Sequence, residues 1–281
     1  MSNLASEERR TLAHADRLTH GQSRYRMEAG AALGRAQPGL LEDERATLHA
    51  GPWFNELPGP LRVAILVSAQ VRLVDAGTVL ARRGDAASAW IGVAGGALRL
   101  GTALADGRDC TLDFVGPGQW FGDIALIDDR PLELDVLAHV PSKLLFVSKA
   151  ELQRLVAGHE ELGPGLLQLN CQRLRHMFRR FEEMQTLPLP QRLARQLQRL
   201  VNQFGRRVGE GVRIDLNLSQ TDLAAIVGGS RQRVNRTLRQ MHLEGIVQLG
   251  EMRMLVRDGA RLAAVAEGRH LLAESGTMVA S

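Results

Sequence analysis

Apolar and polar residues alternate in short runs between Trp53 and Ser148, and glycines separate these runs. The runs are VRLVDAG, TVLARRGD, WIGVAGGALRLG, CTLDFVGPG, LDVLAHV and KLLFVS. Alternation with a period of two indicates strands with one buried face, and frequent glycine-containing turns are typical of small antiparallel architectures. We therefore expect residues 51–150 to form an antiparallel β-roll of the jelly-roll-like kind.

The hydrophobic period changes after Pro164, where steps of three and four replace the alternation. The stripe consists of Leu167, Asn170, Leu174, Met177, Phe181 and Met184. A narrow a/d stripe of this length is typical of a coiled coil, in which a polar a/d residue such as Asn170 fixes the register. We predict a dimerisation helix and hinge at residues 151–187 and a parallel homodimer. A helix that packs on its own roll is the alternative.

The run TLPLPQ breaks this helix, and Pro190 suits the first turn of the next one. Further along, LSQTDLAAIVGGSRQRVNRTLRQMHLEGIV contains the signals of two helices joined by a tight turn. Ser219 and Asp222 form a capping box, Gly228 and Gly229 permit the turn, and Ser230 caps the second helix. Two alternating runs around Gly250 and Glu251 then predict a wing hairpin. Residues 188–258 therefore read as a winged helix-turn-helix.

The two faces of the second helix differ in character. Val234, Leu238 and Met241 lie on one face and are expected in the core. The other face carries long donors and amides: Arg231, Gln232, Asn235, Arg236 and Arg239. A helix with this face at its N-terminal end, after a tight turn, is typical of recognition in the major groove. Arg206 and Arg207 lie outside this helix, so we expect them to contact the DNA backbone at most.

Charge supports a polyanionic partner. Residues 186–281 contain 14 arginines, no lysine and 8 acidic residues, a net charge of +6, which exceeds the +4 of the whole chain. Arginine binds phosphates and guanine edges more specifically than lysine does. Double-stranded DNA is therefore the expected partner, with an inverted-repeat operator if the protein is a homodimer.

Residues 53–258 resemble the Crp/Fnr family of bacterial transcription regulators. The resemblance rests on GPGQWFGD, the seam helix and LSQTDLAAIVGGSRQRVNRTL. It implies an α+β protein with a cyclic-nucleotide-binding-like roll, a long dimerisation helix and a winged helix-turn-helix, and RNA polymerase as a further partner. By the same resemblance Arg231, Gln232 and Arg236 read bases, while Ser219 and Gln220 lie near the backbone. Several members have Glu where this chain has Gln232, so the preferred half-site can differ.

The resemblance also locates an effector pocket, in which the chain departs from its cAMP-binding relatives. Gly122 and Asp123 match the residues that meet the ribose and phosphate. The Arg-Ser pair that holds the cyclic phosphate is replaced by Leu132 and Glu133. A carboxylate repels a phosphate, and each lost charge-assisted bond costs about 1.5–3 kcal/mol. We expect no cAMP binding by the usual contacts, with Arg130 as the alternative phosphate cation.

Other features narrow the functional class. His139 is the only histidine between residues 53 and 147, so we expect no metal site of the cupin kind and no enzyme. The two cysteines cannot ligate an iron–sulfur cluster, and no cofactor is expected. No run is as long and apolar as a membrane span or a signal peptide, so we expect a cytoplasmic protein. A sensor or adaptor that does not bind DNA remains the rival.

Two segments lie outside these assignments. Residues 1–50 read as a polar, charge-balanced N-terminal extension with a helix near residues 4–18, and residues 259–281 as a C-terminal tail. The roll is expected to bind a small-molecule effector other than cAMP or to serve only the geometry of the dimer.

Overall fold

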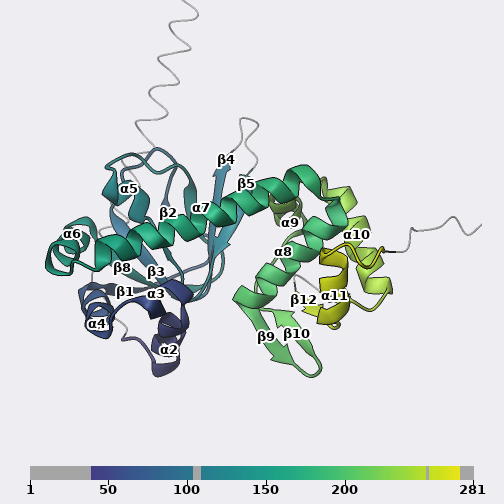
Figure 1. Cartoon of the computed structure of the whole chain (residues 1–281), viewed down its shortest axis with the longest axis horizontal. Coiled ribbons are helices and arrows are strands. Elements are labelled where there is room, and N and C mark those ends of the chain that lie inside the picture. Colours follow the sequence, from purple (N-terminus) through teal and green to yellow (C-terminus); the bar gives the residue numbers. More distant parts are fainter. Residues whose placement is uncertain (1–38, 104–108, 251–252, 273–281) are drawn as a thin grey trace, which may run out of the picture. The chain divides into compact units, whose positions relative to one another are not determined.

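The computed structural model describes residues 39–103, 109–250 and 253–272 (Figure 1). The predicted helix near residues 4–18 lies outside the described residues. In the part of the chain that the structure describes, no helix is both long enough and apolar enough to cross a membrane.

Two four-stranded antiparallel sheets form the predicted roll. One sheet has the order β1 (Gln70–Val74), β8 (Ser142–Ser148), β3 (Ala89–Gly95) and β6 (Trp120–Phe121). The other has the order β2 (Val79–Ala81), β7 (Asp135–Ala138), β4 (Leu98–Ala103) and β5 (Asp109–Val115). Buried residues from both sheets, among them Val93, Leu98, Val136 and Leu144, make up one apolar cluster. The alternation in the sequence thus correctly predicted an antiparallel roll.

Helices cover the other face of the β1–β8–β3–β6 sheet. They are α2 (Glu42–Ala50), α3 (Pro52–Glu56), α4 (Gly59–Ser68), α6 (Lys149–Gly158) and the start of α7 (Leu162–Thr186). Trp90 and Trp120 of the sheet lie 4.3 Å apart between ring centroids, and Trp53 of α3 meets Trp90 edge-on. The Trp53 indole N–H donates to the Gly165 carbonyl of α7 at 2.6 Å. This aromatic cluster therefore ties the roll to the long helix.

The predicted N-terminal extension of residues 1–50 is too long at its C-terminal end. Residues 42–50 form α2, whose Leu48 is fully buried in the aromatic cluster. Glu44 of this helix also pairs with Lys143 of β8 at 2.6 Å. This helix shows no amphipathic pattern in the sequence, because Leu48 is the one residue of α2 that is buried.

The C-terminal part is a winged helix-turn-helix with a larger sheet than the predicted hairpin. Its helices are α8 (Leu189–Phe204), α9 (Gln220–Val227), α10 (Arg231–Leu243) and α11 (Gly259–Ala266). Its sheet has the order β11 (Val247–Leu249), β12 (Met254–Val256), β10 (Gly211–Ile214) and β9 (Gly205–Val208). The sequence reading missed the β9–β10 hairpin. The predicted C-terminal tail of residues 259–281 starts too early in the chain. Residues 259–266 form α11, which buries Leu262 and Val265 in the core of this domain.

Candidate nucleic-acid interface and effector pocket

Local signals in the sequence fix the helix-turn-helix. The Ser219 hydroxyl oxygen accepts from the Asp222 backbone N–H at 3.0 Å, and Asp222 accepts in return from the Ser219 N–H, which completes the capping box. Gly228 ends α9 in the left-handed conformation with φ 61°, which costs glycine little. Ser230 then caps α10 by accepting from the Arg233 N–H at 3.3 Å. The predicted turn chemistry is present at each position.

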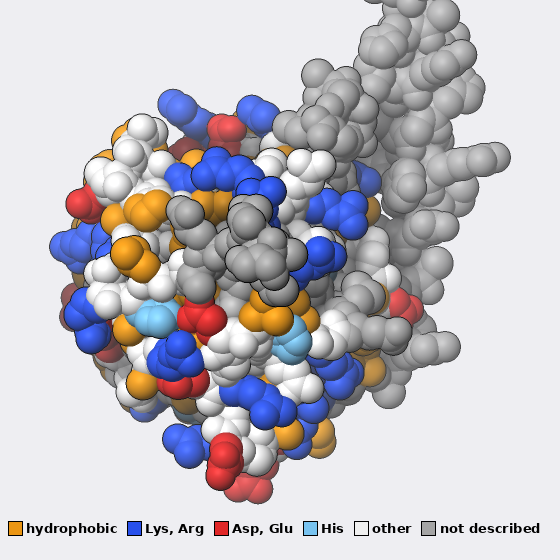
Figure 2. All heavy atoms as spheres, turned by 90° about the vertical axis from the view of Figure 1, so that its right-hand side faces the viewer, with side chains coloured by type: hydrophobic (Ala, Val, Ile, Leu, Met, Phe, Trp, Pro, Cys, Tyr) orange, Lys and Arg blue, Asp and Glu red, His pale blue; other side chains and the backbone are white. Residues whose placement is uncertain are grey.

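Helix α10 has one buried and one exposed face. Val234, Leu238 and Met241 are almost fully buried, as predicted. Arg231, Gln232, Arg236 and Arg239 are exposed, Asn235 is half-buried, and Arg233 adds a further exposed cation. Of the remaining DNA-contact candidates, Ser230 is exposed, whereas Ser219 and Gln220 are partly exposed at the N-terminus of α9. Figure 2 shows basic side chains spread over the side of the molecule that carries α10, and in residues 186–281 these are all arginines. The helix presents several cations and amides that can reach a groove.

The roll places the predicted pocket residues at the start of α5 (Asp123–Ile127). Gly122 has φ 97° and lies so close to the Ala89 carbonyl that a Cβ would be 2.9 Å from its oxygen, so only glycine fits. Asp123 is fully buried and accepts from Asn170 at 2.8 Å and from Arg173 at 2.8 and 2.9 Å, both on α7. Arg173 also donates to the Trp120 carbonyl. The carboxylate already has partners from its own chain.

Sequence reasoning missed Arg173 and assigned Asn170 only to the dimer seam. A buried carboxylate requires a cation or several donors, which is a signal that some α7 arginine should reach it. The sequence does not indicate which of the several arginines on this helix does so. Because Asn170 donates to Asp123 and to the Leu166 carbonyl, its amide is engaged with its own roll.

The predicted phosphate positions are unsuited to an anion in this structure. Leu132 is buried, and its backbone exchanges hydrogen bonds with the 84–85 turn, while Glu133 is exposed. The Arg130 side chain is 81% exposed and lies 3.9 Å from Asp128. Arg82 lies 3.9 Å from the buried carboxylate of Asp135, and the sequence reading did not single it out. Positions 132 and 133 therefore offer no guanidinium to a phosphate.

The seam of α7 is largely open to solvent. Leu167, Leu174, Met177, Phe181 and Met184 have between 46% and 67% of their surface exposed. Phe178, which the heptad pattern left out, is 64% exposed beside them. A row of large apolar side chains on one helix is a typical interaction surface.

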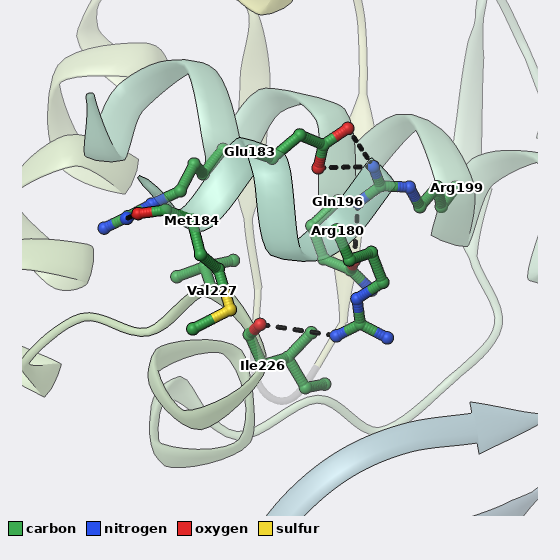
Figure 3. Close-up of a pocket in the computed structure, with 8 residues that line it drawn as sticks. Arg180, Glu183, Met184, Gln196, Arg199, Ile226 and Val227 are labelled. Carbon is green, nitrogen blue, oxygen red and sulfur yellow. Dashed lines mark hydrogen bonds and ion pairs between the residues drawn. The ribbon is translucent and has the colours of Figure 1, made fainter. Parts of the chain in front are cut away.

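A group of arginines joins α7, α8 and α9 (Figure 3). Arg180 donates to Asp113 of β5 at 2.9 Å, to the Leu112 carbonyl at 3.1 Å and to the Ile226 carbonyl at 3.3 Å. Arg192 donates to the carbonyls of Met184 and Gly228 at the ends of α7 and α9. Carbonyls at a helix C-terminus carry partial negative charge, so both arginines are well placed there.

Two titratable side chains of α7 are perturbed by this group. Burial alone would raise the pKa of Glu183, but hydrogen bonds and charge from Arg199 and Arg195 outweigh it and lower the pKa. Burial lowers the pKa of His176. The charge of Asp113 opposes this shift, whereas the charges of Arg180, Arg199 and Arg179 lower the pKa further.

The roll also contacts the helix-turn-helix directly, because the Thr111 hydroxyl of β5 donates to the Asp222 carboxylate of α9 at 2.6 Å.

Comparisons with known proteins agree with this geometry. Residues 71–159 match the cyclic nucleotide-binding domain, and residues 191–265 match the Crp-like helix-turn-helix domain. The two matched segments take up more than half of the chain. Both lie where the structure has the roll and the winged helix-turn-helix, and the second includes α11 up to Val265.

Three similar proteins align with between 60% and 79% of this chain. The "CRP-like cAMP-activated global transcriptional regulator" of Mycobacterium tuberculosis is 28% identical over 60% of this chain and 75% of its own length. The "Cyclic AMP receptor protein" of Thermus thermophilus is 28% identical over 79% of this chain and 99% of its own. A solved CRP/FNR-family transcriptional regulator, also from Thermus thermophilus, superimposes with a TM-score of 0.56, at 26% identity over 72% of this chain and 100% of the other. The chain belongs to the Crp/Fnr family of DNA-binding transcription regulators.

Proposed function

We propose that the protein is a homodimer that binds an inverted-repeat DNA operator through α10 and does not respond to cAMP by the usual phosphate contacts. The DNA-binding part of this proposal rests on the exposed face of α10, a helix that follows a tight turn and is capped by Ser230. Arginine pairs in two-point fashion with guanine O6 and N7, and glutamine with adenine N6 and N7. Arg231, Gln232 and Arg236 supply both kinds of side chain on that face.

The exposed seam of α7 supports the homodimer. A monomer would leave six large apolar side chains, from Leu167 to Met184, in water. Pairing of two α7 helices would bury them at roughly 25 cal/mol per Å² of apolar surface. A parallel pair would also give two recognition helices related by a two-fold axis, which suits half-sites about one helical turn apart, roughly 34–36 Å.

The effector part of the proposal rests on the roll. Two relatives are described as cAMP-activated or as a cAMP receptor, which favours the alternative of a cyclic-nucleotide response through Arg130. Against it, Arg130 lies in solvent beside Asp128, and Asp123 is engaged by α7. We infer that the roll takes a different effector or transmits only dimer geometry. We also propose that the protein contacts RNA polymerase, that it is cytoplasmic and that it has no enzymatic activity.

Selection of bound fragments from the genome, followed by footprinting with and without candidate small molecules, tests the proposal. We expect a protected inverted repeat whose protection is unchanged by cAMP. Uniform binding to all fragments would support a different function, and absence of salt-dependent duplex binding would support the sensor or adaptor alternative. A footprint that appears only with cAMP would overturn the effector part alone.

A further inference from the structure

The first helix of the helix-turn-helix, α9, lies against β5 of the roll and is held there at both ends. At the start of α9, the Thr111 hydroxyl donates to an Asp222 carboxylate oxygen at 2.6 Å. At the end of α9, the Ile226 carbonyl accepts from Arg180, which is itself paired with Asp113 of β5 (Figure 3). The roll therefore holds this helix at its first and at its last turn.

A β-bulge in β5 contributes to this arrangement. Thr111 and Asp113 are opposite Gly101 and Leu100 of β4, so the pairing of the two strands skips Leu112. A bulged residue takes its backbone groups out of the ladder and bends the strand. The Leu112 carbonyl accepts instead from the same arginine of α7 at 3.1 Å. The bulge thus gives the long helix a contact on β5 right beside Thr111.

The Asp222 carboxylate makes two kinds of contact. One oxygen accepts from the backbone N–H and from the hydroxyl of Ser219, which closes the capping box of α9. The other oxygen accepts from Thr111, which is only 2% exposed. Hydrogen bonds to a charged group are stronger than those between neutral groups. The same carboxylate therefore defines where α9 begins and how it is seated on the roll.

The covalent connection between the long helix and the DNA-binding domain is short. Helix α7 ends at Thr186 and α8 begins at Leu189, and Leu187 and Pro188 between them are extended. Because backbone dihedrals are soft, contacts such as those with β5 decide the direction in which the domain points. Helices α9 and α10 are joined by the tight turn and are packed in one core. The seat of α9 on β5 therefore also places α10.

We propose that Thr111, acting through Asp222, determines the spacing of the two half-sites that the dimer accepts. The inference rests on the proposed function, a homodimer on an inverted repeat, and adds a determinant of specificity that lies in the roll. Two recognition helices bind half-sites about one helical turn apart, roughly 34–36 Å. An α9 that is held at both ends gives each α10 one position relative to its own roll. An operator with a longer or shorter spacer then fits poorly, although all of its bases are correct.

Operators that differ only in the length of the spacer test this. Thr111→Val keeps the shape of the side chain but removes the hydrogen bond to a charged group, so its preference for the best spacer over spacers changed by one or two base pairs should fall roughly tenfold. Thr111→Ser keeps the hydroxyl and should keep the preference of the wild type. Thr102→Val on β4 is the matched control, because the Thr102 hydroxyl donates to the Ala103 carbonyl of its own strand.

Binding to a single half-site separates the placement of α10 from its folding. Affinity for an isolated half-site and discrimination among its bases should be equal in Thr111→Val and the wild type, because the side chains of α10 are unchanged. Thermal unfolding checks that each variant is folded.

Equal spacer preferences in Thr111→Val and the wild type would overturn the inference. So would a loss of half-site affinity in Thr111→Val, since the hydroxyl would then support the fold of the helix-turn-helix and not its placement. A wild type that binds repeats of every spacing equally also contradicts the inference, but the proposed DNA-binding function then stands. A wild type that binds no inverted repeat contradicts the proposed function itself.

Discussion

The guanidinium of Arg180 in α7 lies 2.9 Å from the carboxylate of Asp113 in β5. The same side chain donates to the Ile226 carbonyl at the end of α9. One arginine of the long helix therefore contacts both the roll and the helix-turn-helix. Because Thr111, two residues before Asp113, also bonds to Asp222 of α9, β5 and α9 are connected twice.

Replacing Arg180 by methionine should loosen this junction without removing the bulk of the side chain. Charge-assisted hydrogen bonds are worth about 1.5–3 kcal/mol each, so amide exchange in β5 and α9 should become at least roughly tenfold faster. Hydrogen exchange read by mass spectrometry measures this. Arg179→Met, at an exposed neighbouring position, is the control. Equal exchange in the two variants would mean that Arg180 does not hold the junction.

The seam prediction concerns assembly. Leu174→Glu should convert the protein to a monomer in dilute solution, because the interface would bury a charge without a partner. Arg179→Glu, which falls outside the a/d stripe, should remain dimeric. Sedimentation velocity distinguishes the species. A wild-type protein that sediments as a monomer at micromolar concentration would contradict the homodimer.

The readout prediction concerns Arg236. Its replacement by alanine should cost about 1–3 kcal/mol at one guanine position of the operator and little on random DNA. Competition binding with a panel of single-base operator variants measures this, since the mutant should become indifferent to that one position. If the mutant retains the full discrimination of the wild type, α10 is not the reading helix.

Patterns along the chain predicted the roll, the long helix and the helix-turn-helix because each has its own period and its own turn residues. The capping pairs at Ser219 and Ser230 are local, so the sequence alone was enough to place them. The errors lie where tertiary contacts decide. A polar helix such as α2 is held by Leu48 and a salt bridge to a distant strand, and neither leaves a periodic signal.

The site shows the same division. Exposed residues of α10 follow from helical geometry once the buried face is known. By contrast, the partnership of Asp123 with Arg173 joins residues 50 positions apart, and the β9–β10 hairpin depends on strand pairing. Register between strands and the choice among several arginines are set in three dimensions, which explains why sequence reasoning did not find them.

The pH prediction follows from His176. Its pKa in the folded protein is lowered from 6.5, so the unfolded chain binds a proton more readily than the folded one. The stability linked to this residue is therefore complete above pH 6.5 and is lost as the pH falls below that value. His176→Gln should unfold with a flatter pH dependence between about pH 7 and 5 than the wild type. Urea denaturation at several pH values measures this, and parallel curves for the two proteins would contradict it.

The effector prediction is that calorimetry with millimolar cAMP shows no binding and that operator affinity does not change. A ligand shifts a conformational equilibrium only through its differential affinity for the two states. Neither Leu132 nor Glu133 carries a positive charge that could bind a cyclic phosphate, and the Asp123 carboxylate is already hydrogen-bonded to Arg173. Arg130→Ala separates the alternatives, because this exposed side chain can be removed without disturbing the core. A micromolar dissociation constant that disappears in Arg130→Ala would establish the cyclic-nucleotide alternative.

The converse experiment restores the missing pair. Leu132→Arg combined with Glu133→Ser should gain measurable cAMP affinity if the loss of these two residues alone prevents binding. The backbone hydrogen bonds between Leu132 and the 84–85 turn do not involve the side chain, so the new arginine can keep the loop in place. Leu132→Met with Glu133→Ser is the uncharged control and should not bind. If the restored pair binds cAMP no better than this control, the hydrogen bonds between Asp123 and α7 also prevent nucleotide binding. Adding Arg173→Ala to the restored pair should then produce measurable cAMP affinity.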